Sequence, residues 1–209
     1  MPSGLVLIDK QQGWTSHDVV AKLRGILGTR KIGHAGTLDP MATGLLVLGV
    51  DAGTKLLQFI SGSDKQYLAT IRLGEATHTD DAEGEVVFQK SATGITAKDV
   101  DAEIVKLTGD ISQTPSSVSA IKVDGKRAYD LVREGKEVEL KSRPVTIHEF
   151  ARTSELRNVG ECVEFDVLVN CSSGTYVRAL ARDIGKALGV GGHLTMLRRT
   201  MIDGFDVSN

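Results

Sequence analysis

A glycine-rich stretch from Gly33 to Gly44 places the strongest constraint on how this chain folds. It reads Gly-His-Ala-Gly-Thr-Leu-Asp-Pro-Met-Ala-Thr-Gly, and the apolar run Leu45–Val50 follows at once. Glycines and a proline this close together indicate a tight loop, and the apolar residues after it indicate a buried strand. Pro40 disfavours helical backbone at Asp39. The pattern therefore predicts a carboxylate on an extended or turn backbone, directly before a core strand.

Two interpretations of Asp39 follow from this setting. A glycine-rich loop lets another molecule approach the backbone closely, which would suit a nucleophile or a base. Alternatively, an aspartate before a proline often hydrogen-bonds its own backbone in a turn. Spacing alone leaves both interpretations open.

The composition is that of an ordinary globular protein and limits what the surface can bind. The 209 residues are 41% hydrophobic, 25% charged and 4% aromatic, with a formal net charge of −2. This balance argues against a broad basic surface, so a nucleic-acid site would have to be a local basic groove. Arg30 and Lys31, directly before the loop, are well placed to meet phosphates, although a solvated turn explains them equally well.

The sequence shows no long apolar span and no signal peptide, so we expect a cytoplasmic protein that does not enter a membrane. Cys162 and Cys171 lie in an alternating, strand-like run, which favours two reduced, buried thiols over a disulfide or a zinc site. The acidic segment 75–85 lacks the ligand spacing of a calcium loop, and we expect a solvated loop without metal.

The hydrophobic patterns predict alternating strands and helices of an α+β protein. Strands are predicted at 4–8, 45–50, 67–73, 138–150, 161–171 and 191–200, and helices at 15–27, 54–60, 96–107 and 175–189. Tyr67 lies at the start of its strand, where it would either line a site or be a half-buried sheet tyrosine. His193 is expected to be structural.

A second stretch with chemical potential runs from Gly174 to Arg178. Thr175 is predicted to cap the helix, which places Tyr176 and Arg178 in its first turn. A cation near a helix N-terminus opposes the helix dipole, so Arg178 indicates a specific anionic partner.

Together these stretches closely resemble the TruB family of tRNA pseudouridine synthases. The family's central pattern is Gly-His-x-Gly-x-Leu-Asp-Pro-x-Ala-x-Gly, and the matching residues are Gly33, His34, Gly36, Leu38, Asp39, Pro40, Ala42 and Gly44. Asp-Lys-x-Tyr at 64–67, Gly-Thr-Tyr-hydrophobic-Arg at 174–178 and Leu-Arg-Arg at 197–199 follow in the family's order. One departure is Gln11, which stands where the family usually has proline.

The resemblance covers about residues 4–205 and implies the family's fold. We expect a pseudouridine synthase fold, in which a large mixed, mainly antiparallel sheet is flanked by helices and loops and carries a central active-site cleft. Residues 1–209 would form a single catalytic domain, with residues 113–143 as an insertion that clasps RNA. Family members usually carry a further C-terminal RNA-binding domain that we do not find here, so we expect a shortened or a naturally short form.

The resemblance also implies a reaction and a set of site residues. The reaction is isomerisation of uridine 55 in the T loop of tRNA to pseudouridine, without cofactor or metal, on a T-arm stem-loop bound by a monomer. Asp39 would be the essential carboxylate, Arg178 its partner and Tyr67 the active-site tyrosine. Substrate contacts are expected from His34, Tyr176 and Leu197, and Arg198 and Arg199 would face phosphate.

Two other classes of function are compatible with parts of the sequence. A non-catalytic tRNA-binding or tRNA-folding protein would use the same motifs, and substitution of Asp39 separates it from an enzyme. A phosphotransferase with Asp39 as phosphoryl acceptor is disfavoured, because Met41 interrupts the Asp-x-Asp pattern and the chain has no P-loop.

Overall fold

The structure, a computed structural model, describes residues 3–118, 122–123, 126–127 and 140–207. The chain divides into two compact units, one formed by Met1–Leu68 with Leu197–Asn209 and the other by Ala69–Met196. The first unit contains β1 (Gly4–Lys10), α1 (Ser16–Leu27), β2 (Ile32–His34), β3 (Thr43–Val50), the 3₁₀ helix η1 (Asp51–Leu56), α2 (Leu57–Ser61) and β14 (Phe205–Asp206). Two strands, β4 (Lys65–Leu73) and β13 (Gly192–Ile202), contribute residues to both units.

The second unit contains the remaining described elements. They are β5 (Glu75–Thr77), β6 (Val86–Gln89), α3 (Ala97–Lys106), β7 (Gly109–Gln113), β8 (Lys122–Val123), β9 (Lys126–Arg127), β10 (Arg143–Arg152), β11 (Arg157–Val159), β12 (Cys162–Cys171) and α5 (Val177–Ala187). Of the expected RNA-clasping insertion, residues 119–121, 124–125 and 128–139 lie outside the described residues.

Strand pairing confirms the predicted α+β class and the large mixed sheet. The main order is β1-β3-β13-β4-β12-β10-β7, with β2, β11 and β14 paired to its members. The β13–β3 pair is parallel, whereas β1–β3, β10–β12 and β10–β7 are antiparallel. The sheet is therefore mixed and mainly antiparallel, as expected.

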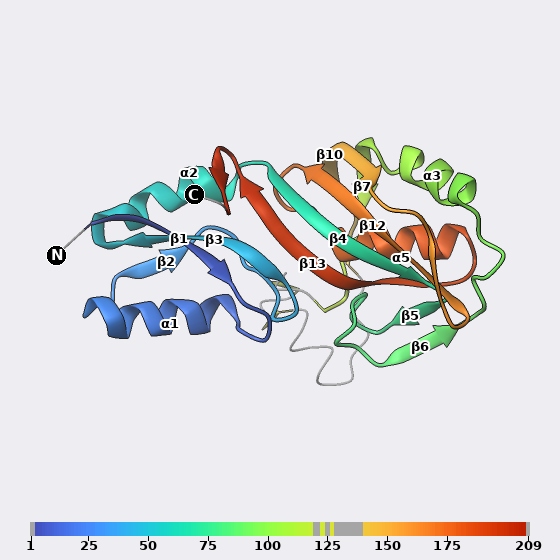
Figure 1. The fold of residues 1–209 in the computed structure, drawn as a ribbon. Coiled ribbons are helices and arrows are strands. Elements are labelled where there is room, and N and C mark those ends of the chain that lie inside the picture. Colours follow the sequence, from blue (N-terminus) through green and yellow to red (C-terminus); the bar gives the residue numbers. More distant parts are fainter. Residues whose placement is uncertain (1–2, 119–121, 124–125, 128–139, 208–209) are drawn as a thin grey trace. The chain divides into compact units, whose positions relative to one another are not determined.

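In the first unit, α1 begins and ends where the sequence predicts. Thr15 caps it through a reciprocal capping box with Asp18, and Gly28 ends it in the left-handed conformation with φ 63°. In Figure 1, α1 and α2 lie on opposite sides of β1, β2 and β3. One core cluster of this unit joins α2 to the strands and contains Ala35, Leu45, Val47, Leu57, Ile60 and Ile202. The apolar run after the glycine-rich loop is thus the buried strand that was predicted.

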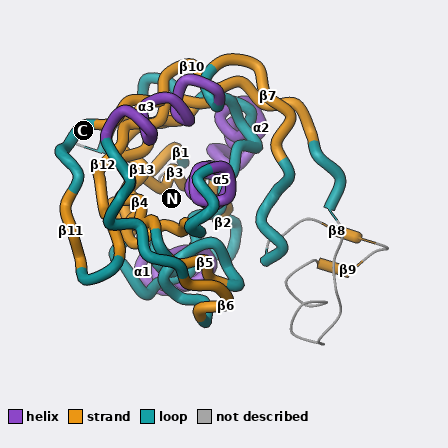
Figure 2. The backbone as a smooth tube through the Cα atoms, turned by 90° about the vertical axis from the view of Figure 1, so that its right-hand side faces the viewer, coloured by secondary structure: helices purple, strands orange, loops and turns teal. Residues whose placement is uncertain are grey.

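In the second unit, a close glycine contact seats α5. A Cβ on Gly185 would lie 2.2 Å from the carbonyl carbon of Gly191, so the helix and the following turn touch backbone to backbone. The helix buries Leu180 and Ile184 completely. Figure 2 shows β5 and β6 as neighbours, and they pair antiparallel. Cys162 and Cys171 are buried free thiols, as predicted.

Candidate active site

The N-terminal end of α1 and the turn before it hold the loop of Asp39 on both sides of that residue. The Ser16 hydroxyl accepts a hydrogen bond from the Leu38 amide at 2.9 Å and lies 3.2 Å from the Leu38 carbonyl oxygen, to which it donates. On the other side, the Gly13 amide donates to the Pro40 carbonyl oxygen at 2.8 Å. Asp39 itself is half-buried between these two anchors. Its backbone is therefore fixed while its side chain remains partly accessible.

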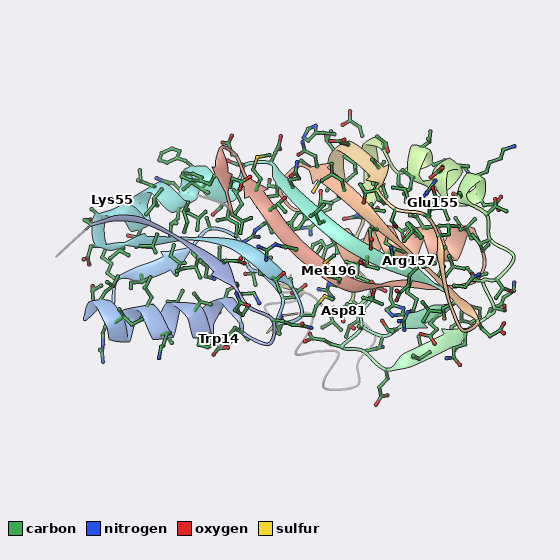
Figure 3. All side chains as sticks on the ribbon, viewed as in Figure 1. Trp14, Lys55, Asp81, Glu155, Arg157 and Met196 are labelled. Carbon is green, nitrogen blue, oxygen red and sulfur yellow. The ribbon has the colours of Figure 1, made fainter. Side chains whose placement is uncertain are left out.

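A buried lysine ties the same turn together. Lys10 is 1% exposed, and its Nζ donates to the carbonyl oxygens of Trp14 at 2.7 Å, Gln11 at 3.1 Å and Pro40 at 3.4 Å. Figure 3 labels Trp14 in this turn. Gln11, the departure from the family pattern, takes part through its backbone carbonyl. The turn keeps its anchor although it lacks the usual proline.

Arg199 closes the loop from the other side, and here one expectation is wrong. Arg199 was expected to face phosphate, but it is 1% exposed. Its Nε donates to the Leu45 carbonyl oxygen at 2.8 Å and its guanidinium to the Gly36 carbonyl oxygen at 3.1 Å. A Cβ on Gly44 would lie 2.1 Å from the Arg199 carbonyl oxygen, which explains the glycine at that position. The guanidinium is thus a structural brace of the glycine-rich loop.

Its neighbour Arg198 is occupied by a surface ion pair. Its guanidinium donates two hydrogen bonds to the Asp9 carboxylate, at 2.9 and 2.7 Å. The Arg198 guanidinium lowers the pKa of Asp9 below its ordinary value. Both side chains are partly exposed, so Arg198 remains near solvent.

Three further predicted site residues belong to the same unit. His34 ends β2 and is half-buried, Tyr67 is 8% exposed on β4, and Leu197 is 6% exposed on β13. Tyr67 is thus more deeply buried than the half-buried sheet tyrosine that the pattern allowed. Whether these side chains meet the substrate stays a prediction.

The second unit fixes Arg178 at the second position of α5. The side chain is 5% exposed, and the guanidinium donates to the carbonyl oxygens of Thr79 at 2.6 Å and Val118 at 3.0 Å. It also lies 3.4 Å from the Asp81 carboxylate. The inference of an anionic partner is confirmed for Asp81. The pairing of Arg178 with Asp39 stays a prediction.

The burial of Asp81 and its pairing with Arg178 were not predicted from the sequence. Segment 75–85 was expected to be a solvated acidic loop, but Asp81 is 2% exposed and Asp80 is 9% exposed. The Asp81 carboxylate accepts hydrogen bonds from the Thr79 hydroxyl and the Glu83 amide. Asp80 is buried beside Arg182 at 3.2 Å, and burial raises the pKa of Asp80. Thr79, two residues before Asp81, offers a hydroxyl donor, and this spacing is the local signal that could have indicated a buried Asp81.

Tyr176 differs from the prediction in its position on α5. Thr175 was expected to cap the helix, but Tyr176 occupies the N-cap, without a side-chain cap. Gln113 instead fixes the backbone of this N-cap residue, because its side-chain oxygen accepts from the Tyr176 amide at 2.8 Å and its side-chain nitrogen donates to the Tyr176 carbonyl oxygen at 3.1 Å. The Arg143 guanidinium lies 5.0 Å from the centre of the Tyr176 ring, a cation–π contact.

His193 is structural, as predicted, since it is buried with Nδ1 3.1 Å from the Glu75 carbonyl oxygen. Among the residues that the structure describes, no cluster of three possible metal ligands occurs. Within the same described ranges, no helix combines the length and apolar character needed to span a bilayer.

Comparison with known families finds two adjoining matches. Residues 24–177 match the model described as TruB family pseudouridylate synthase, N-terminal domain. Residues 178–209 match the tRNA pseudouridylate synthase B C-terminal domain. The boundary falls directly before Arg178, inside the Gly-Thr-Tyr-Val-Arg motif.

Curated relatives are similar over nearly the whole chain. Proteins named tRNA pseudouridine synthase B from Arthrobacter sp. (strain FB24) and Mycobacterium avium (strain 104) are 61% and 62% identical over 203 and 204 residues. These matches cover 97% and 98% of this chain, and the chain spans 66% of the length of each relative.

Two solved structures share the fold. A chain of a Cbf5–Nop10–Gar1 complex matches with a TM-score of 0.69 and 30% identity, over 97% of this chain and 50% of its own length. A chain of an H/ACA RNP bound to a substrate RNA containing 2′-deoxyuridine matches with a TM-score of 0.66 and 28% identity, over 97% and 48%.

Proposed function

Because the chain belongs to the TruB family of pseudouridylate synthases, we propose that it converts a uridine of tRNA to pseudouridine. The relatives named tRNA pseudouridine synthase B support the reaction. The family motifs identified in the sequence support uridine 55 of the T loop as the target. The pseudouridine synthase fold, shared with the matched structures, supports the same class of chemistry.

The proposed reaction is an isomerisation. The glycosidic bond between uracil N1 and ribose C1′ breaks, the uracil turns, and a bond forms between its C5 and C1′. C5 loses a proton and N1 gains one, so substrate and product have the same atoms and the same oxidation state. The step requires a carboxylate, a site for the displaced base and a place for the C5 proton.

The anchored loop of Asp39 is the observation that carries this proposal. Hydrogen bonds fix the backbone at Leu38 and at Pro40, and the carboxylate between them is half-buried. A reacting group held in this way has little orientational freedom to lose when the substrate arrives. Asp39 would attack the sugar, attack the base or remove a sugar proton.

We also propose that Arg178 pairs with Asp39 in the active enzyme. Arg178 is held by two backbone carbonyl oxygens and lies beside Asp81. A guanidinium has five N–H donors in a fixed plane, so one that is already oriented can also pair with a second carboxylate. Such a pair would hold the Asp39 carboxylate in a fixed orientation.

The remaining site residues are assigned to the flipped base and its surroundings. Extracting a base from a folded loop costs a few kcal/mol, which contacts in the pocket must offset. Tyr67 would stack on the uracil and help to remove the C5 proton, while Tyr176 and Leu197 complete the pocket wall. His34 would stack on the displaced bases, as aromatic rings commonly do with RNA. We propose a monomer that recognises the T-arm stem-loop.

The test is release of tritium from C5-labelled uridine in a T-arm stem-loop, comparing the wild type with Asp39→Asn. Release by the wild type alone supports the enzyme with Asp39 as its carboxylate. Equal release from both proteins would show that Asp39 is not the essential carboxylate. RNA binding without release in either protein would favour the alternative, a non-catalytic tRNA-binding or tRNA-folding protein.

A further inference from the structure

The ring of His17 contacts the ring of His34, which is proposed to contact the substrate. No sequence motif includes His17. The rings of His17 and His34 are 5.7 Å apart between centroids and cross at 81°. This is an edge-to-face arrangement, in which the positive edge of one ring meets the negative face of the other. His17 is exposed on α1, whereas His34 is half-buried at the end of β2.

The backbone around His17 is fixed on both sides. Thr15 and Asp18 form the capping box, with the Thr15 amide donating to the Asp18 carboxylate at 2.9 Å. Ser16 bonds the backbone of Leu38. His17 therefore projects from an anchored first turn of α1, and this turn also holds the loop of Asp39.

The His34 ring needs such support. Its Nδ1 is buried and has no hydrogen-bond partner among the residues described. Burial is the largest cause that lowers the pKa of His34, followed by the nearby charge of His17. Arg199 acts in the same direction, and a hydrogen bond with the Gly36 backbone opposes it. Because Nδ1 has no hydrogen-bond partner among the described residues, packing contributes to the orientation of the ring.

The charged groups around this ring pair come from several elements of the same unit. Arg199 on β13 acts on His34. Lys10 on β1 and His17 both act on Asp18, which lies next to His17 on α1. Asp39 lies in the loop that follows His34.

We propose that His17 is a positioning residue, whose ring holds the His34 ring edge-to-face at the border of the loop that carries Asp39. His34 then presents a fixed surface to the nucleobases that the flipped uridine leaves behind. The catalytic consequence inferred for His17 rests on the proposed function. The ring contact itself does not depend on that function.

The test compares His17→Ala with His17→Phe, because phenylalanine keeps a ring and removes the nitrogens. We expect kcat/KM for tritium release to fall about three- to tenfold in His17→Ala, the range of a lost aromatic pair. His17→Phe should recover to within about twofold. In a His34→Ala background, His17→Ala should add no further loss, because His17 acts through His34. His148→Ala, which removes an exposed histidine on β10, is the matched control.

A second measurement is independent of activity. NMR titration of labelled histidine rings should show changed His34 ring shifts in His17→Ala and an upward shift of the His34 pKa. Unchanged His34 ring signals, or equal impairment of His17→Ala and His17→Phe, would overturn the proposal. If the wild type releases no tritium, the proposed function fails, and the NMR titration alone decides whether His17 positions His34.

Discussion

Substituting Ser16 with alanine tests the anchor of the Asp39 loop most directly. The hydroxyl is 1% exposed and serves both the amide and the carbonyl group of Leu38. A buried backbone group that loses its partner costs about 1–3 kcal/mol. Because one substitution leaves two such groups, we expect Ser16→Ala to lower the free energy of unfolding by roughly 2–4 kcal/mol. Alanine is itself a good helix former, so α1 should persist.

Urea unfolding measures this loss as a lower midpoint at an unchanged m value. Ser63→Ala is the matched control, since the Ser63 hydroxyl donates to the Phe59 carbonyl oxygen and the Asp203 carboxylate from a partly exposed position. We expect the control to change stability by no more than about 0.5 kcal/mol. Loosening the loop should also reduce kcat about tenfold or more, because small displacements of a reacting group are costly. If Ser16→Ala unfolds and reacts like the control, the anchor does not support the site.

Two further predictions concern packing and pH. Gly185→Ala should destabilise the second unit by several kcal/mol, because its Cβ would lie 2.2 Å from the carbonyl carbon of Gly191. Gly25→Ala on α1 is the control: its Cβ meets no atom within 4 Å, so the substitution should be neutral or stabilising by about 1 kcal/mol. Thermal unfolding of the two variants measures the difference. Arg157 lowers the pKa of Asp166 below 3.8, so this carboxylate adds stability above about pH 4 and loses it as the pH falls through its folded pKa. The partly exposed pair is worth about 1 kcal/mol or less, and Asp166→Asn should flatten the acid side of the stability curve.

Local signals predicted the elements around the site well. Thr15 and Gly28 bound α1 because capping depends on residues only a few positions apart. The apolar run after the glycine-rich loop became β3 for the same reason, since a continuous apolar stretch must be buried. Such features depend on neighbouring residues alone, so they can be predicted without tertiary information.

The errors all involve partners that are distant in the sequence. Asp81 looked solvated because its cation, Arg178, comes almost a hundred positions later. Arg198 and Arg199 looked alike, but neighbouring strand residues point to opposite faces. One guanidinium therefore meets Asp9 near solvent and the other is buried in the glycine-rich loop. Tyr176 rather than Thr175 occupies the N-cap, and the distant Gln113 on β7 holds the Tyr176 backbone there.

The hydrogen bonds of Arg199 also determine when the glycine-rich loop can be completed during synthesis. Its hydrogen bonds to Leu45 and Gly36 join residues 154 and 163 positions apart. During translation the glycine-rich loop leaves the ribosome long before Arg199 is synthesised, and contacts of such separation form slowly. The glycine-rich loop of a nascent chain is therefore not fully braced until residue 199 has been synthesised. Chains that end before residue 199 lack both hydrogen bonds and leave the glycine-rich loop without this brace.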